Sequence, residues 1–312
     1  MDAMQRLGIG LAALGRPAYI NVGRAEELPF DRTVASLRKA TWNVLDVAYS
    51  VGIRWVDAAR SYGKAEAFLS EWLASREPED LTVSSKWGYA YVGEWKVDAP
   101  VHEVKEHSLE RFRAQYAETS ELLEGSLSVY QVHSLTEDSP LFHDVRLQAA
   151  LAKLAAKGIR VGFSTSGPRQ ADTIRRAMAL EVAGQRLFST VQSTWNILET
   201  SAEDALREAH ESGLHVIVKE AMANGKLAIR PPMAVRRVAS KNYVQPDALA
   251  LAAALSRPWA DTVLIGAVSP AQMEANLDAT KVSLDQDELD ILAGLSIPPE
   301  RYWAERSALP WT

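Results

Sequence analysis

The sequence predicts a single (β/α)8 barrel of the TIM type, with residues 1–312 forming one domain. Short β-branched runs alternate with longer segments of helical periodicity, which is the pattern of repeated βα units. Eight such runs occur, the number that closes a barrel. Two helix-end signals, Lys157-Gly158 and Ser212-Gly213, lead directly into the following run, as short connections in parallel sheets do.

The elements follow one another without a linker or low-complexity tract that would divide the chain. The expected strands are Leu7–Leu11, Ile53–Asp57, Leu81–Lys86, Ser128–His133, Arg160–Ser164, Thr190–Gln192, His215–Lys219 and Thr262–Gly266. The expected helices are 33–51, 64–76, 103–125, 143–158, 168–182, 202–213 and 246–257, with two more at 270–278 and 286–295. Only residues 1–6 precede the first strand, so we expect no N-terminal hairpin, or a rudimentary one.

A doubly wound dinucleotide-binding sheet is the alternative fold, because it also alternates strands and helices. Residues 8–13 match the G-x-G-x-x-A pattern of such sheets. That pattern requires a helix directly after the glycines, and residues 16–30 contain Pro17, Gly23 and Pro29, which indicate a loop. We therefore favour the barrel.

Composition excludes several classes of function. A formal net charge of -6 argues against nucleic-acid partners, which require an excess of Lys and Arg on one face. The absence of cysteine excludes disulfides, thiol catalysis and zinc-thiolate sites. No signal core and no run of 18 apolar residues is present, so we expect a soluble, cytoplasmic protein without membrane or metal partners.

Ionisable side chains close three of the expected strands. Asp57 ends the second strand, Lys86 the third and His133 the fourth, and Tyr62 lies in the loop after Asp57. The carboxyl ends of barrel strands converge on one face, where active sites are built, so these four side chains should meet there. Each alone also has an ordinary structural explanation, such as a helix cap or a solvated charge.

Together the four residues indicate acid catalysis of carbonyl reduction. A free phenol titrates near 10, too high for efficient proton transfer at neutral pH. We expect Lys86 to lower the pKa of Tyr62, Asp57 to hold the lysine in place, and His133 to orient the carbonyl oxygen. No side chain supplies a hydride, so a cofactor is required.

Three segments resemble the motifs of the aldo-keto reductase family. Residues 56–63, Val-Asp-Ala-Ala-Arg-Ser-Tyr-Gly, resemble its Asp-Thr-Ala-x-x-Tyr-Gly signature, residues 83–88 its lysine strand and residues 126–134 its histidine strand. The resemblance implies that Asp57, Tyr62, Lys86 and His133 are catalytic and that NADP(H) is the cofactor, with NAD as a possibility. It also implies a small-molecule carbonyl substrate.

The resemblance further implies a set of cofactor-binding residues. They are Gly10, Leu11, Ala12, Asp57, Ser164, Thr165, Gln192, Lys219, Glu220, Met222, Gly225, Gly266, Gln272 and Asn276. Three positions depart from the family pattern: Thr165 replaces an asparagine, Lys219 an aromatic ring that stacks on the nicotinamide, and Val268 an arginine. The polar members of the set would otherwise simply satisfy backbone groups.

Two further expectations concern ligands. Clustered aromatic side chains after the third strand and in the C-terminal tail suggest an apolar wall for bulky or aromatic substrates, namely Trp87, Tyr89, Tyr91, Trp95, Tyr302, Trp303 and Trp311. Five cations in residues 226–241 suggest a loop that closes over the cofactor phosphates and favours NADPH: Lys226, Arg230, Arg236, Arg237 and Lys241.

The leading prediction of function is NADP(H)-dependent reduction of an aldehyde or ketone. A sugar or alcohol dehydrogenase is the alternative within enzymes, because one site catalyses both directions. A non-catalytic barrel that binds the cofactor as a regulatory subunit is the alternative outside them. The sequence leaves the oligomeric state open.

Overall fold

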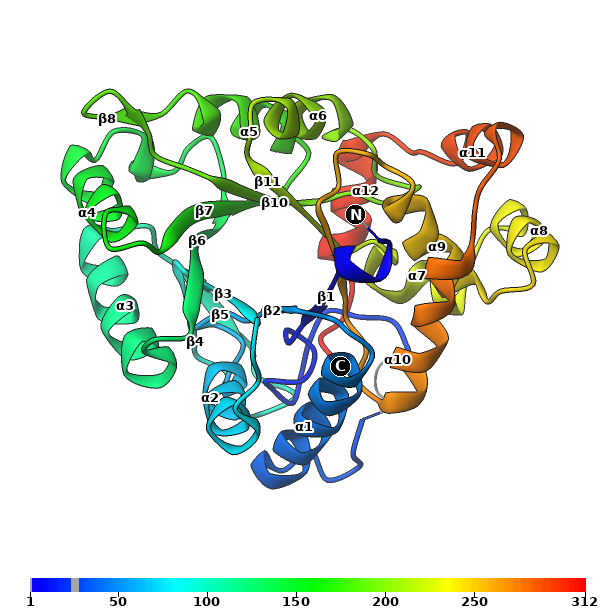
Figure 1. The fold of residues 1–312 in the computed structure, drawn as a ribbon, viewed down its shortest axis with the longest axis horizontal. Coiled ribbons are helices and arrows are strands. Elements are labelled where there is room, and N and C mark those ends of the chain that lie inside the picture. Colours follow the sequence, from blue (N-terminus) through cyan, green and yellow to red (C-terminus); the bar gives the residue numbers. More distant parts are fainter. Residues whose placement is uncertain (1, 24–27) are drawn as a thin grey trace.

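A closed barrel of eight parallel strands forms the centre of the computed structural model, which describes residues 2–23 and 28–312 (Figure 1). The strands are β1 (Leu7–Gly10), β2 (Trp55–Asp57), β3 (Thr82–Trp87), β6 (Leu127–Leu135), β7 (Arg160–Thr165), β10 (Thr190–Thr194), β11 (His215–Lys219) and β12 (Thr262–Ile265). They pair in chain order, and β12 returns to β1, with Leu7 opposite Val263 and Ile9 opposite Ile265. The predicted barrel is confirmed.

Helices surround this barrel at the positions where helical periodicity predicts them (Figure 1). They are α1 (Val34–Ser50), α2 (Ala65–Arg76), α3 (Leu109–Leu123), α4 (Val145–Ala155), α5 (Gln170–Met178), α6 (Glu203–Glu211), α9 (Pro246–Leu255), α10 (Pro270–Leu277) and α11 (Gln286–Ala293). Capping side chains fix several starts: the oxygens of Thr33, Ser108 and Asp144 accept hydrogen bonds from backbone N–H groups in the first turns.

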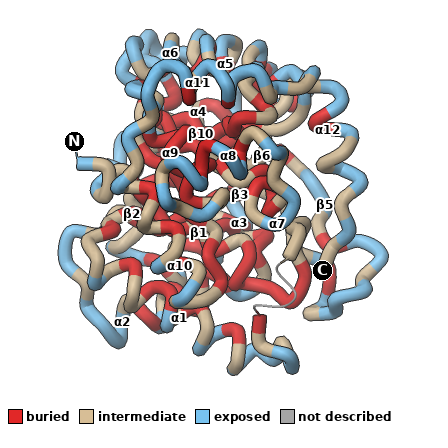
Figure 2. The backbone as a smooth tube through the Cα atoms, turned by 90° about the vertical axis from the view of Figure 1, so that its right-hand side faces the viewer, coloured by how far each residue is buried: buried red, intermediate tan, exposed pale blue. Residues whose placement is uncertain are grey.

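Burial is concentrated in the strands and on the inner helix faces (Figure 2). Inside the barrel, Trp55, Val129, Ile217 and Leu264 form a cluster of their own, one residue from each of four strands. Helix α9 is buried on every side over residues 248–255, because it lies between the barrel and α8 (Met233–Lys241). The barrel interior is therefore filled by side chains, and a ligand site must lie at one of its ends.

Two of the predicted helices are too long. The helix expected at 103–125 begins at Leu109, because Glu103–Lys105 forms strand β5 and pairs antiparallel with β4 (Tyr89–Tyr91). The helix expected at 168–182 ends at Met178, and Glu181–Val182 (β8) pairs with Gln185–Arg186 (β9). In both places, residues expected at the end of a helix instead form one strand of a small antiparallel pair, and the second strand lies in the adjacent loop.

The segment 226–241 is not the loop that its composition suggests. It contains α7 (Lys226–Ile229) and α8, and the tail adds α12 (Pro299–Ser307), which was not predicted. Met1 and residues 24–27, which fall in segments expected as N-terminal extension and loop, lie outside the described residues.

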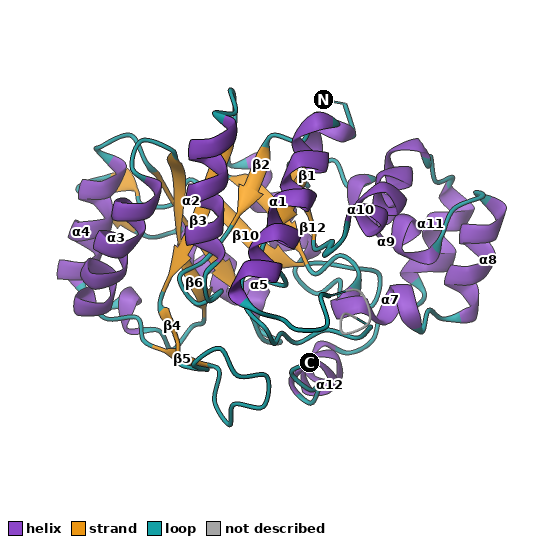
Figure 3. Cartoon of the chain, turned by 90° about the horizontal axis from the view of Figure 1, so that it is seen from below, coloured by secondary structure: helices purple, strands orange, loops and turns teal. Residues whose placement is uncertain are grey.

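One arginine covers the amino-terminal end of the barrel. Residues 4–6 form a single turn of 3-10 helix, and the Arg6 guanidinium donates to the carbonyl oxygens of Leu255 and Arg257 at 2.7 Å each and to that of Ala260. In Figure 3 the N-terminus lies at one end of the strands, while α12, the C-terminus and β4–β5 lie at the other. None of the helices in the described ranges is long and apolar enough to cross a membrane.

Candidate active site

A cavity of about 320 Å³ opens at the carboxyl ends of the strands. Asp57, Tyr62 and His133 line it together, and Lys86 lies directly behind Asp57. The structure thus brings together the four residues that the sequence places at strand ends. Its wall also includes Gly10, Ala12, Arg16, Tyr19, Asn21, Tyr89, Glu103, Ser134, Ser166, Gln192, Lys219, Glu220, Met222, Asn224, Gly225, Gly266, Arg306 and Trp311.

Asp57 and Lys86 form a buried ion pair on adjacent strands. The Lys86 ammonium donates to the Asp57 carboxylate and, at 2.9 Å, to the carbonyl oxygen of Ala58. The other carboxylate oxygen of Asp57 accepts from the Ser84 hydroxyl at 2.7 Å and the Gln192 amide at 3.1 Å. These bonds fix both charges, so Gln192 supports the carboxylate from across the barrel as well as lining the cavity.

Tyr62 and His133 present their rings to the same part of the cavity. Their centroids are 5.5 Å apart in an edge-on arrangement, and the Lys86 ammonium lies 5.0 Å from the centroid of the Tyr62 ring. The backbone of His133 is held by His107, whose Nε2 donates to its carbonyl oxygen at 2.8 Å. The four groups expected to catalyse are therefore neighbours in space.

Burial determines the protonation of both rings. Burial, followed by the negative charge of Asp57, raises the pKa of Tyr62 well above its usual value of 10.0. The net shift in the pKa of Tyr62 is thus upwards, opposite to the decrease expected from Lys86. Burial and the nearby cations Lys86 and Lys219 lower the pKa of His133 far below 6.5. Both rings are consequently neutral at pH 7.

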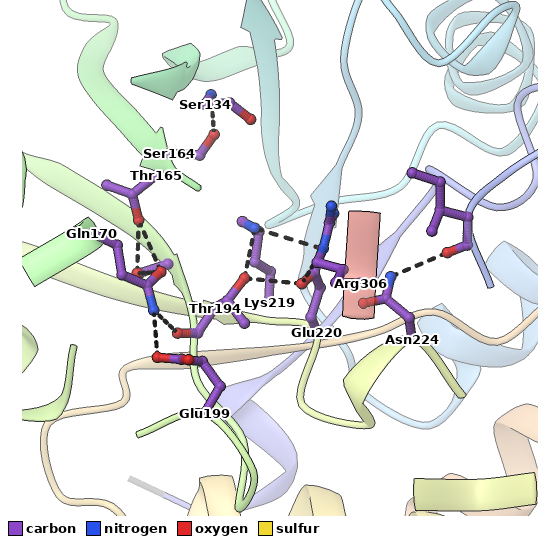
Figure 4. A network of polar contacts seen from close by, with 12 residues as sticks. Ser134, Ser164, Thr165, Gln170, Thr194, Glu199, Lys219, Glu220, Asn224 and Arg306 are labelled. Carbon is purple, nitrogen blue, oxygen red and sulfur yellow. Dashed lines mark hydrogen bonds and ion pairs between the residues drawn. The ribbon is translucent and has the colours of Figure 1, made fainter. Parts of the chain in front are cut away.

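Most of the expected cofactor residues line the cavity, but several do not. Leu11 is buried in the core. The expected cofactor residues that do line the cavity are Gly10, Ala12, Asp57, Gln192, Lys219, Glu220, Met222, Gly225 and Gly266. Ser164 and Thr165 are fully buried: the Ser164 oxygen accepts from the Ser134 N–H at 2.8 Å, and Thr165 bonds the Ser193 hydroxyl at 2.7 Å (Figure 4).

The neighbours of that buried pair, Ser134 and Ser166, line the cavity instead. Gln272 and Asn276 lie outside it. Gln272 accepts from the Val268 N–H at 3.0 Å, and Asn276 donates to Asp247 at 2.7 Å. In the ligand-free structure these two side chains thus satisfy local partners.

A second charged cluster borders the cavity at the end of β11. Arg306, from α12, donates to both carboxylate oxygens of Glu220 at 2.5 to 3.1 Å (Figure 4). The Lys219 ammonium donates to the Thr194 hydroxyl at 2.8 Å, and that hydroxyl donates to Glu220 at 3.0 Å. Burial lowers the pKa of Lys219 to about 8. Burial opposes ionisation of Glu220, but Arg306 and Lys219 lower its pKa to about 2.

Arg16 is a site residue that sequence reasoning missed. Its side chain is 1% exposed, and its guanidinium lies 4.9 to 5.2 Å from the ring centroids of Tyr19, Tyr62 and Trp311. It donates to Glu103 at 2.7 Å and to the Ser61 carbonyl at 2.9 Å. Arg16 is the only charge between residues 7 and 19, and this was the available signal. Arg306 had no such signal, because its role depends on where the tail folds.

The expected aromatic wall is only partly present. Tyr89 and Trp311 line the cavity, but Trp87 packs on Phe112 and Trp95 on Phe68. Tyr302 and Trp303 belong to a separate apolar cluster under α12, and Tyr91 lies outside the cavity wall. Charged and amide side chains, among them Arg16, Gln192 and Glu220, form much of the rest of the cavity wall.

The five cations of residues 226–241 do not form a closing loop. Lys226 pairs with Glu305 at 2.8 Å, and Lys241 pairs with Asp285 and Glu288 at 3.0 Å each. Arg230, Arg236 and Arg237 are exposed, the last two on α8. The expectation of a loop is wrong because Val235, Val238 and Ala239 bury one face of helix α8.

Comparison with known proteins agrees with this arrangement. The model of the aldo/keto reductase family matches residues 6–297. No curated protein sequence matches the chain. Within the residues described, no group of His, Cys, Asp and Glu has the arrangement of a metal site.

Several solved structures share the fold at low sequence identity. The holo form of an aldo-keto reductase from Bacillus halodurans is 20% identical with a TM-score of 0.67, over 94% of this chain and 92% of that one. A protein assigned as an aldo-keto reductase from Pseudomonas aeruginosa is 19% identical with a TM-score of 0.65, over 88% and 89%. A protein assigned as a 2,5-diketo-D-gluconic acid reductase B is 19% identical with a TM-score of 0.65, over 95% of this chain and 89% of that one.

Proposed function

Because the chain belongs to the aldo/keto reductase family of oxidoreductases, we propose that it reduces an aldehyde or ketone to the alcohol, with NADPH as cofactor and Tyr62 as the proton donor. The observation that carries this proposal is the shared cavity of Tyr62 and His133 with the Asp57–Lys86 pair behind it. These residues can hold and deliver a proton, and none can deliver a hydride.

The residues of the cavity fit the nicotinamide end of such a cofactor, which supplies the hydride when bound. Gly10 and Gly266 expose backbone at the cavity wall, and a Cβ atom on Gly266 would meet no other atom within 4 Å. Ser134, Ser166 and Gln192 offer hydroxyl and amide groups that would hold the carboxamide.

Tyr62 keeps its proton at neutral pH and is therefore in the form that can donate, although a raised pKa also makes the phenol a weaker acid. Its raised pKa means that the hydroxyl is a donor throughout the physiological range. As charge develops on the substrate oxygen, the Tyr62 proton moves to that oxygen, and the nearby Lys86 ammonium stabilises the phenolate that remains.

Neutral His133 orients the carbonyl group. Its Nδ1 lies 3.4 Å from the Ser61 hydroxyl; in the tautomer that accepts a hydrogen bond from this hydroxyl, Nε2 carries the ring proton and can donate to the substrate oxygen. Tyr89 and Trp311 offer an apolar surface beside this position, and we propose that a bulky or aromatic part of the substrate packs there.

Replacing Tyr62 by Phe tests the proposal. The change removes only the transferable proton, so single-turnover hydride transfer should slow by about 100- to 10,000-fold while NADPH affinity is retained. Tyr89→Phe is the matched control, because Tyr89 lines the same cavity, and it should retain most of the rate.

An unchanged rate in Tyr62→Phe would show that Tyr62 is not the acid. Tight NADPH binding by the wild type without turnover of any aldehyde, quinone or sugar would favour the non-catalytic barrel.

A further inference from the structure

The carboxyl end of the barrel carries more positive than negative charge. Among the described residues in the cavity wall and directly behind it, the cations are Arg16, Lys86, Lys219 and Arg306, and the carboxylates are Asp57, Glu103 and Glu220. Lys86 pairs with Asp57, Arg16 with Glu103 at 2.7 Å, and Arg306 with Glu220 at 2.5 Å. The remaining cation is Lys219.

The carboxylate nearest to Lys219, that of Glu220, is already paired with Arg306. Arg306 bonds both oxygens of Glu220, whereas the Lys219 ammonium stands 3.7 Å from the nearer oxygen and donates to the neutral Thr194 hydroxyl. Glu220 therefore balances one of two cations. Figure 4 shows this cluster, with Lys219 and Arg306 converging on Glu220 from different elements.

The excess charge acts at His133. Lys86, Lys219 and Arg16 each disfavour a proton on this ring, so the potential at His133 is positive. Lys219 lines the same cavity of about 320 Å³ as Tyr62 and His133, so a ring that reaches those two residues shares this small space with the Lys219 ammonium.

We propose that Lys219 makes the cavity select the reduced form of the dinucleotide, so that the protein binds NADPH more tightly than NADP⁺. The inference rests on the proposed function. The two forms carry the same phosphates, but the oxidised nicotinamide ring has a positive charge that the reduced ring lacks. A second cation in this small, partly desolvated cavity is repelled by Lys219.

Coulomb's law gives the order of magnitude of the effect. Two unit charges about 6 Å apart at an effective dielectric constant near 20 change an equilibrium by about 100-fold, and Glu220 offsets part of this. We expect NADPH to bind about 10- to 100-fold more tightly than NADP⁺. An oxidised cofactor that binds weakly would also leave readily after each reduction.

Calorimetric titration of each dinucleotide tests the proposal without any turnover. The dissociation constants of NADPH and NADP⁺ are measured at pH 7 for the wild type, Lys219→Met and Lys219→Arg. Lys219→Met should tighten NADP⁺ binding by about tenfold or more and leave NADPH nearly unchanged, whereas Lys219→Arg should keep the wild-type ratio. Lys226→Met, which removes a cation outside the cavity, is the matched control and should also keep it.

Equal affinities in the wild type would overturn the proposal, and this result needs no variant to fold. A ratio that is the same in wild type and Lys219→Met would overturn it as well. Absence of binding of both dinucleotides would instead overturn the proposed function, and the inference with it.

Discussion

Replacing Glu220 by Gln should change how the stability of the protein depends on acid. The folded-state pKa of Glu220 is about 2, below the ordinary value of 4.5, because Arg306 and Lys219 favour the carboxylate against the cost of burial. A lowered folded-state pKa contributes stability that is complete above the unfolded pKa and is lost as the pH falls towards 2. The two values correspond to about 3 kcal/mol at pH 7.

The same two pKa values fix how this contribution declines. It should fall to about 2 kcal/mol at pH 3.5 and to about 1.4 kcal/mol at pH 3. Urea unfolding of the wild type and Glu220→Gln, followed by circular dichroism at each pH, measures it. The difference between the two proteins isolates Glu220, since every other carboxylate is common to both.

The wild type should therefore lose its advantage over Glu220→Gln by about 1 to 2 kcal/mol between pH 7 and pH 3. Glu118→Gln removes an exposed carboxylate of α3 and gives the baseline for losing one acidic group. A wild-type advantage that stays constant across this range would refute the argument that Glu220 is held ionised by the two cations.

Two further predictions concern ligands of the same cavity. An aryl aldehyde should have a higher kcat/KM than glyceraldehyde, because Tyr89 and Trp311 offer it an apolar surface, and comparable values would count against that surface. The wild type should bind NADPH more tightly than NADH, as dissociation constants will show, and equal affinities would end the claim of NADPH preference.

The barrel could be predicted from the sequence because each of its strands is a local pattern. A short run of β-branched residues can be recognised from the run itself, whatever the strand later packs against. The polar residue that ends the run marks the active face of the barrel. Asp57, Lys86 and His133 were found in this way, without knowledge of any contact.

Other parts of the site depend on contacts between distant segments. The turn signals of residues 88–105 do not reveal that Glu103 pairs with Arg16 or that β5 pairs with β4. Likewise, Arg306 acquires its role only when α12 folds back onto β11. For α8 a local signal did exist, since Val235, Val238 and Ala239 have helical spacing, but the cations of residues 226–241 suggested a loop.

The pairing of β1 with β12 has a consequence for how the chain acquires its structure. This pairing closes the barrel by joining its first strand to its last strand. Beside it, Arg6 is hydrogen-bonded to Ala260, 254 positions away in the sequence. Until β12 is available, β1 and β11 both present unpaired strand edges, which are templates for aggregation. Ring closure also spans the longest loop in the barrel, so its entropic cost is met last. A nascent chain on the ribosome therefore remains open to intermolecular pairing until β12 has emerged.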